Sequence, residues 1–182
     1  ASQSYATAVG AYAGFYTTGS YNTFMGYKAG YGGTTSAPYS SGQRNIAVGY
    51  QALKAFTTGD DNIAIGYQAA DSLTTSNMVI AIGHSAAQAF TADRGYGVYI
   101  GRNAGYSETG TYNDTMIGND AGYTQNLGGA GTSYGYNTNI GFQSGFSNAS
   151  GTSNTYIGNA AGHAKTGGSN VAVGMRAMQN VA

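Results

Sequence analysis

Few residues in this chain have the types and spacing that catalysis requires. Its two histidines, His84 and His163, lie far apart in the sequence and at different positions of the repeat described below, so they cannot act as a pair within one chain. Asp60 and Asp61 form an acidic doublet in a turn before Asn62, with too few oxygen ligands for Ca²⁺. No calcium-repeat, phosphate-loop or nucleophile motif is present. We therefore expect no catalytic residue, no metal site and no cofactor.

Aromatic side chains are the other candidates for chemistry at a surface. The chain holds 17 tyrosines and 6 phenylalanines, many of them one or five residues after a recurring glycine. Stacked repeats would align such residues into ladders. These ladders either pack between chains, as aromatic pairs do favourably, or face solvent and hold sugar rings or a protein partner. The predicted ligand-binding candidates are Tyr27, Tyr31, Tyr39, Tyr50, Tyr67, Tyr106, Tyr123, Tyr134, Tyr136, Phe142 and Phe146.

Two stretches lengthen the repeat and are the best local candidates for binding. Residues 31–44 and 123–136 each add about six residues to the common unit. Loops on a rigid solenoid are where binding tends to be placed. Their composition, polar with tyrosines and no excess of charge, would suit a neutral glycan, although a tolerated surface insertion is an equal alternative.

A repeat of about 17 residues must position these side chains. Each copy has an aliphatic residue, a glycine, two variable residues and then a small residue, and we call this glycine the corner glycine. The ten corner glycines are Gly10, Gly26, Gly49, Gly66, Gly83, Gly101, Gly118, Gly141, Gly158 and Gly174. A period this short and regular predicts an all-β parallel β-solenoid of about ten coils, in a single domain spanning residues 1–182.

Each coil is expected to begin with a short strand. Asparagine four residues before the corner glycine often follows a glycine three residues earlier, a pattern typical of turns. Ile63 and Ile65 share one face at the strand period. The corner glycine suits a sharp bend or the close approach of another backbone. We predict a second short strand after it, and an inward aliphatic layer formed by the residue before it.

A single inward aliphatic layer would leave a lone coil under-packed. We therefore expect another face of the solenoid to pack against identical chains. The residue two before the corner glycine points away from the predicted aliphatic layer. It is small in several coils and would allow close contact between chains there. These small residues are Ala8, Ala47, Ala64, Ala81 and Ala172.

Composition favours an extracellular structural protein. Charged residues make up 8% of the chain, with seven basic and seven acidic side chains, so nucleic-acid binding has no electrostatic basis. The absence of cysteine excludes a disulfide scaffold. Neither a signal peptide nor a membrane span is recognised, so we expect no membrane insertion by this segment, and a chain that is either processed or delivered without the secretory route.

Several copies resemble a known family. Residues 45–52 and 62–69, which read Asn-Ile-Ala-Val/Ile-Gly-Tyr-Gln-Ala, and residues 170–174 resemble the head repeats of trimeric autotransporter adhesins, the YadA-like head family. Residues 22–31 (Asn-Thr-Phe-Met-Gly-Tyr-Lys-Ala-Gly-Tyr) resemble repeats in bacteriophage tail-fibre proteins. The similarity runs from about residue 5 to 178. It implies a left-handed parallel β-roll, three chains per head, and a role in surface attachment.

The chain also departs from the family pattern. The adhesin unit is shorter than this one, so longer outer turns are expected here. The position two before the corner glycine also holds large residues, which would force the chains apart if it packed at a threefold axis. These larger residues are Phe24, Tyr99, Met116, Asn139 and Tyr156.

The sequence thus predicts a non-enzymatic attachment domain of a homotrimeric fibre, on a bacterial surface or a phage virion, that recognises a cell-surface glycan or protein receptor. A self-assembling filament subunit is the alternative. An ice-binding solenoid is a remote third, because threonine recurs only in part at one position of the repeat, namely Thr23, Thr115, Thr138 and Thr155.

Overall fold

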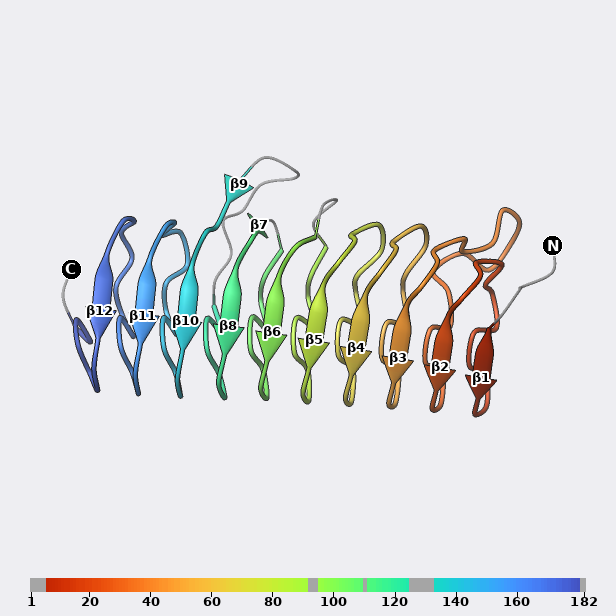
Figure 1. Cartoon of the computed structure of the whole chain (residues 1–182), viewed down its shortest axis with the longest axis horizontal. Helices are drawn as coiled ribbons and strands as arrows, with labels where there is room; N and C mark the ends of the chain where they lie inside the picture. Colours follow the sequence, from red (N-terminus) through yellow and green to blue (C-terminus); the bar gives the residue numbers. More distant parts are fainter. Residues whose placement is uncertain (1–5, 92–94, 110, 125–132, 181–182) are drawn as a thin grey trace.

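The computed structural model describes residues 6–91, 95–109, 111–124 and 133–180, and these form an all-β parallel β-solenoid of about nine turns with no helix. The coils stack into a straight rod with the two ends of the chain at opposite ends (Figure 1). The strands are β1 (Thr7–Val9), β2 (Thr23–Met25), β3 (Ile46–Val48), β4 (Ile63–Ile65), β5 (Ile80–Ile82), β6 (Val98–Ile100), β7 (Thr111–Tyr112), β8 (Thr115–Ile117), β9 (Ser133–Tyr134), β10 (Thr138–Ile140), β11 (Thr155–Ile157) and β12 (Val171–Val173).

One long sheet runs the length of the rod. Its ten parallel strands follow the order β1-β2-β3-β4-β5-β6-β8-β10-β11-β12, and β7 pairs separately with β9. Equivalent residues of neighbouring coils are paired, so Ile63 faces Ile80 and Ile65 faces Ile82. Because no residue slips between coils, each position of the repeat becomes a straight row along the rod.

The predicted second strand is wrong. The segment after each corner glycine forms turns, because the second and fourth residues after it have positive φ, as at Gln68 (52°) and Ala70 (48°). Its backbone nevertheless bonds to the neighbouring coils: the Gln68 N–H donates to the Tyr50 carbonyl (2.8 Å) and the Ala70 N–H to the Ala86 carbonyl (2.9 Å). These bonds join the coils on the side opposite the sheet.

The corner glycine makes both the sharp bend and the close approach that the sequence predicts. Gly141 has a φ of 129°, and a Cβ there would lie 2.5 Å from the carbonyl oxygen of Gly158 in the next coil. A non-glycine residue would be strained by this φ and would also push the two coils apart.

The core lies on the other side of the strand from the one that we predicted. The middle residue of each strand points inward, so that Ala64 is fully buried, whereas Ile65 is 38% exposed. Alternation along a strand shows that Ile63 and Ile65 share a face, but it does not show which face is interior. Ala69, the small residue after the corner glycine, is also buried in this interior.

Large residues at the middle position therefore fill their own coil and do not separate chains. Where this residue is Tyr99, the fourth position after the corner glycine is Gly105, and a Cβ there would overlap the Tyr99 ring. Where it is Ala47, that position holds Leu53, and Phe56 also fills the interior. The same pairing of a large residue with a glycine recurs for Phe24 with Gly30, Met116 with Gly122, Asn139 with Gly145 and Tyr156 with Gly162.

A buried row of asparagines fastens one end of each strand. The Asn62 N–H donates to Oδ1 of Asn45 (2.9 Å), and the Asn62 side-chain amide donates to the Ser76 carbonyl (2.8 Å). Asn137 and Asn154 repeat the pattern, with the Asn154 N–H donating to Oδ1 of Asn137 (3.0 Å). These asparagine side chains thus bond to backbone groups, and the bonds join successive coils.

We predict that Gly141→Ala lowers the free energy of unfolding far more than Gly174→Ala does. The two positions have similar φ, 129° and 121°, but a Cβ at Gly174 meets nothing within 4 Å. Strain alone should cost Gly174→Ala about 1–2 kcal/mol, while the added backbone clash should raise the cost of Gly141→Ala above about 3 kcal/mol. Urea unfolding followed by circular dichroism measures both. Equal losses would show that the contact between coils is not what requires glycine.

Candidate functional site

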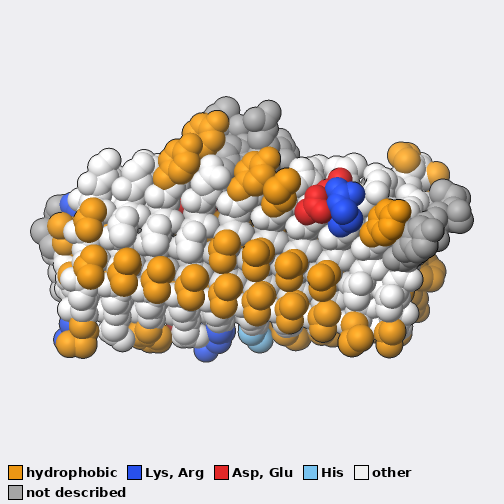
Figure 2. Space-filling model, viewed as in Figure 1, with side chains coloured by type: hydrophobic (Ala, Val, Ile, Leu, Met, Phe, Trp, Pro, Cys, Tyr) orange, Lys and Arg blue, Asp and Glu red, His pale blue; other side chains and the backbone are white. Residues whose placement is uncertain are grey.

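The rod has two long faces of different chemistry. The first and third residues of each strand point outward and form what we call the sheet face, which Figure 2 shows as rows of hydrophobic side chains along the strands. None of these side chains is charged. They are Thr7, Val9, Thr23, Met25, Ile46, Val48, Ile63, Ile65, Ile80, Ile82, Val98, Ile100, Thr115, Ile117, Thr138, Ile140, Thr155, Ile157, Val171 and Val173.

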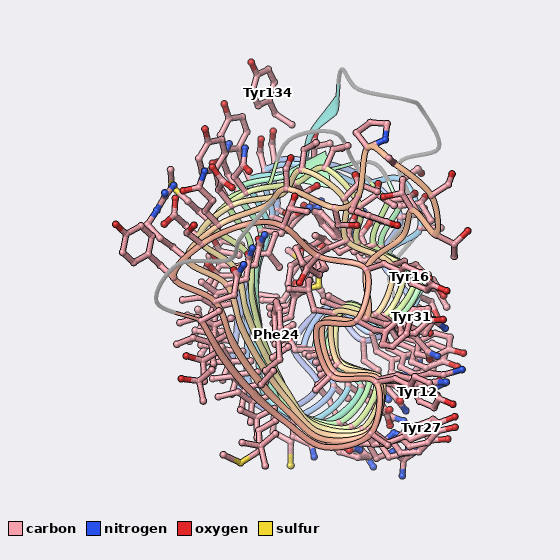
Figure 3. The ribbon with its side chains drawn as sticks, turned by 90° about the vertical axis from the view of Figure 1, so that its right-hand side faces the viewer. Tyr12, Tyr16, Phe24, Tyr27, Tyr31 and Tyr134 are labelled. Carbon is pink, nitrogen blue, oxygen red and sulfur yellow. The ribbon has the colours of Figure 1, made fainter. Side chains whose placement is uncertain are left out.

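The opposite side carries the aromatic ladders, and we call it the aromatic face. In the end-on view, Tyr12, Tyr16, Tyr27 and Tyr31 point away from the coil on the side opposite the strands, while Phe24 points into the core (Figure 3). The turn after each corner glycine therefore places its side chains on a surface that the sheet does not share.

The first ladder consists of residues that directly follow a corner glycine. Tyr27, Tyr50, Tyr67 and His84 stack in this order with ring centroids 5.4, 5.0 and 4.8 Å apart and with nearly parallel rings. His84 thus continues an aromatic ladder, a role that a search for tyrosine and phenylalanine alone does not detect. Its place one residue after Gly83 is the signal that could have shown it.

The second ladder consists of residues five after a corner glycine. Tyr106, Tyr123, Phe146 and His163 stack with centroids 5.0, 5.1 and 5.1 Å apart. The two histidines therefore belong to different ladders, as their different repeat positions predict. His84 stacks on Tyr67 and His163 stacks on Phe146, so each histidine ring packs as a member of its ladder.

A compact aromatic cluster forms at the N-terminal end of the aromatic face. Tyr31 stacks on Phe15 (6.1 Å, 10° between the rings) and meets Tyr16 edge to face at 5.0 Å. The hydrogen bond to Tyr31 raises the pKa of the Tyr16 hydroxyl above its ordinary value. The ammonium of Lys28 lies 5.3 Å from the centroid of Tyr31 and 6.0 Å from that of Tyr12. Sequence reasoning missed Tyr12, Tyr16 and Lys28.

All eleven predicted candidates lie at the surface of the single chain, but they are not one site. Tyr39 stacks on Tyr16 at 6.0 Å, and Phe142 is exposed further along the rod. Tyr134 and Tyr136 stack on each other at 5.3 Å on a separate edge, where Tyr134 points away from the coil (Figure 3). The candidates therefore divide into the two ladders, the N-terminal cluster, this edge pair and the separate Phe142.

The first lengthened interval, residues 31–44, folds against the coils beside it. The Ser40 N–H donates to the Tyr16 carbonyl (3.0 Å) and the Gly33 N–H to the Phe56 carbonyl (2.8 Å). Next to it lies a hollow of about 360 Å³ that is lined by Lys28, Tyr31, Gly32, Gly33, Thr35, Gln51, Lys54 and Ala55. Most of the second interval, residues 125–132, lies outside the described residues.

The acidic doublet forms an exposed ion pair. The Arg44 guanidinium contacts the carboxylates of Asp61 (2.6 Å) and Asp60 (3.2 Å), and its hydrogen bond to Asp61 holds the pKa of that carboxyl below its ordinary value. In the described part of the chain, no group of three His, Cys, Asp or Glu residues could hold a metal ion.

Comparison with known proteins gave no family assignment: no family model, curated protein or solved structure matches the chain. Over the described ranges, no helix has the length and apolar character needed to cross a bilayer. What the chain does must therefore be inferred from its surfaces.

We predict that the first ladder is a solvent-facing surface and not a buried seam. Tyr50→Ala, which removes two stacking contacts of a half-exposed ring, should cost about 1–2 kcal/mol. Phe90→Ala is the matched control, because its ring is fully buried, and it should cost about 3–5 kcal/mol. Chemical unfolding gives both values. If Tyr50→Ala matched or exceeded Phe90→Ala, the ladder would be packed between chains.

Proposed function

We propose that this chain is a non-enzymatic domain of a homotrimeric fibre that attaches to a host or cell surface, as part of a bacterial surface adhesin or a phage tail fibre. The observation that carries the proposal is the sheet face, a continuous uncharged surface of aliphatic and threonine side chains along the rod. The resemblance of the repeats to adhesin heads and tail fibres supplies the number of chains, the left-handed β-roll and the extracellular location.

The apolar character of the sheet face indicates that another protein surface covers it. Monomeric proteins rarely expose contiguous apolar patches larger than a few hundred Å². Its side chains are mostly β-branched, and their straight in-register rows offer the same shape at every coil, so identical faces can interdigitate along the whole rod. In a trimer joined by this face, the aromatic face points outward, because it lies on the opposite side of each coil.

Attachment is then assigned to the aromatic face and the first lengthened interval. Half-exposed tyrosines offer flat apolar surface with a polar edge, and they suit sugar rings and protein partners alike. The half-exposed members include Tyr27, Tyr50 and Tyr67 of the first ladder, and Tyr39 in the lengthened interval. A cell-surface glycan or protein is the proposed receptor.

A self-assembling filament is the second candidate. β1 and β12 are the outer strands of the long sheet, and Val171 and Val173 in β12 are each 66% exposed. Outer strands with free backbone groups can pair with another copy. Electron microscopy would show indefinite threads for a filament and short rods for a fibre domain.

Ice binding is the remote third candidate, and one observation favours it. Thr115, Thr138 and Thr155 lie in a row on the flat sheet face, beside a row of isoleucines. A trimer would cover this row, so ice binding and trimer formation by the sheet face exclude each other. Thermal hysteresis shown by a monomeric protein would favour ice binding.

We predict that negative charge on the sheet face dissociates the trimer. Ile65→Asp with Ile82→Asp would bury carboxylates without partners in the proposed interface. We expect this double variant to dissociate at protein concentrations at least about a hundredfold higher than those at which the parent protein dissociates. Native mass spectrometry gives the number of chains. Gln68→Asp, on the opposite side of the coil, is the control and should leave three chains. A monomeric parent protein at micromolar concentration would contradict the proposal.

We also predict that attachment requires the first lengthened interval together with the first ladder. Replacing residues 31–44 by the turn of a 17-residue coil, or changing Tyr27, Tyr50 and Tyr67 to alanine, should abolish binding by the labelled trimer to a glycan array and to receptor-bearing cells. Variants that remain trimeric by mass spectrometry are the ones to compare. Unchanged attachment by both would remove the aromatic face from the proposal.

A further inference from the structure

The hollow beside the first lengthened interval brings together side chains from two coils and from the interval itself. Lys28 and Tyr31 come from one coil, and Gln51 and Lys54 come from the next. Gly32, Gly33 and Thr35 belong to the lengthened interval. The hollow therefore lies where the aromatic ladder meets the loop, and it is lined by a ring, an amide, a hydroxyl and two ammonium groups.

The ladder position of Tyr31 explains why the hollow is there. In the second ladder, Tyr123 is covered by Tyr106 on one side and by Phe146 on the other. Tyr31 stands at the same position of the repeat and stacks on Phe15, but the equivalent residue of the next coil is Lys54, which is not aromatic. The side of Tyr31 toward that coil therefore lines the hollow and contacts no further ladder ring.

The charge of the hollow comes from Lys28. Lys54 is already engaged by Asp71, with 2.9 Å between Nζ and Oδ1. Lys28 lies against the rings of Tyr12, Tyr27 and Tyr31 and has no carboxylate partner among the described residues. Aromatic faces attract and orient an ammonium group, but they do not neutralise it. The ammonium is therefore held in place and remains able to pair with an anion.

We infer that this hollow binds an acidic sugar, a pyranose ring that carries a carboxylate. The apolar side of the ring packs on Tyr31, the carboxylate accepts a hydrogen bond from Lys28, and the hydroxyls lie within reach of Gln51 and Thr35. The inference names the ligand class for the proposed attachment function and rests on it. It departs from the neutral glycan that residues 31–44 suggest by composition, because Lys28 lies outside that interval.

The test compares three small probes on the intact protein. Glucuronic acid has the ring and the carboxylate, glucose has the same ring without the charge, and acetate has the charge without the ring. Titration followed by NMR at low salt should give an affinity for glucuronic acid at least about tenfold higher than for glucose or acetate. Added salt should weaken it, since charges this close to solvent are screened.

Two variants and a control locate the binding. Lys28→Met should reduce the affinity for glucuronic acid to that for glucose, and Tyr31→Leu should reduce it to that for acetate. Tyr123→Leu, at the equivalent position of a fully stacked ring, should leave it unchanged, and thermal melting would verify that all three variants fold. Equal affinity for glucuronic acid and glucose, no binding of either, or binding that both variants retain would overturn the inference. Selective glucuronic acid binding by a protein that does not attach to cells would contradict the proposed function alone.

Discussion

Every feature of this protein depends on one backbone contact, the approach of each corner glycine to the carbonyl group of the glycine in the next coil. At Gly141 the gap leaves no room for a Cβ, and the φ of 129° is one that only glycine adopts readily. Each coil is therefore fixed directly above its neighbour with no offset in register. Consequently, a position of the repeat that holds asparagine becomes a buried hydrogen-bonded row, and one that holds tyrosine becomes a ladder.

This regular backbone tolerates an irregular core. The interior of each coil is filled from the strand side by residues such as Tyr99 or from the turn side by residues such as Phe90, and the opposing position shrinks to glycine or alanine. Volume is thus compensated within one coil, as close packing requires. The outer surface keeps the same period even where the core changes, so that the sheet face remains continuous along the rod.

The period and the in-register parallel sheet could be predicted from the sequence, because glycine and asparagine recur at fixed spacing and stacked coils align recurring positions. The side of the strand that faces the core could not be predicted. Ile63-Ala64-Ile65 alternates in the same way whether the alanine or the isoleucines point inward. The answer depends on the side of the strand on which the coil closes, and the turn residues with positive φ that close it leave no mark in composition.

The candidate site was predictable in the same partial way. The tyrosines at fixed positions of the repeat align into ladders, as their spacing predicts. Lys28 and Tyr12 were missed because their outward direction follows from positive φ at the second residue after the corner glycine, where the residue type varies from coil to coil. Lys54 replaces an aromatic ring at the repeat position of Tyr31. This replacement points to a binding site only when the hollow beside it is known.

In the proposed assembly, the sheet face joins identical chains while the aromatic face points outward. Because the chain has no cysteine, a single spin label can be attached at Thr115→Cys on the sheet face or at Gln68→Cys on the aromatic face. Pulsed electron paramagnetic resonance then measures the distances between labels in the assembly. We expect labels at residue 115 to lie closer together than labels at residue 68. The reverse order, or no dipolar coupling at either position, would contradict the proposed assembly.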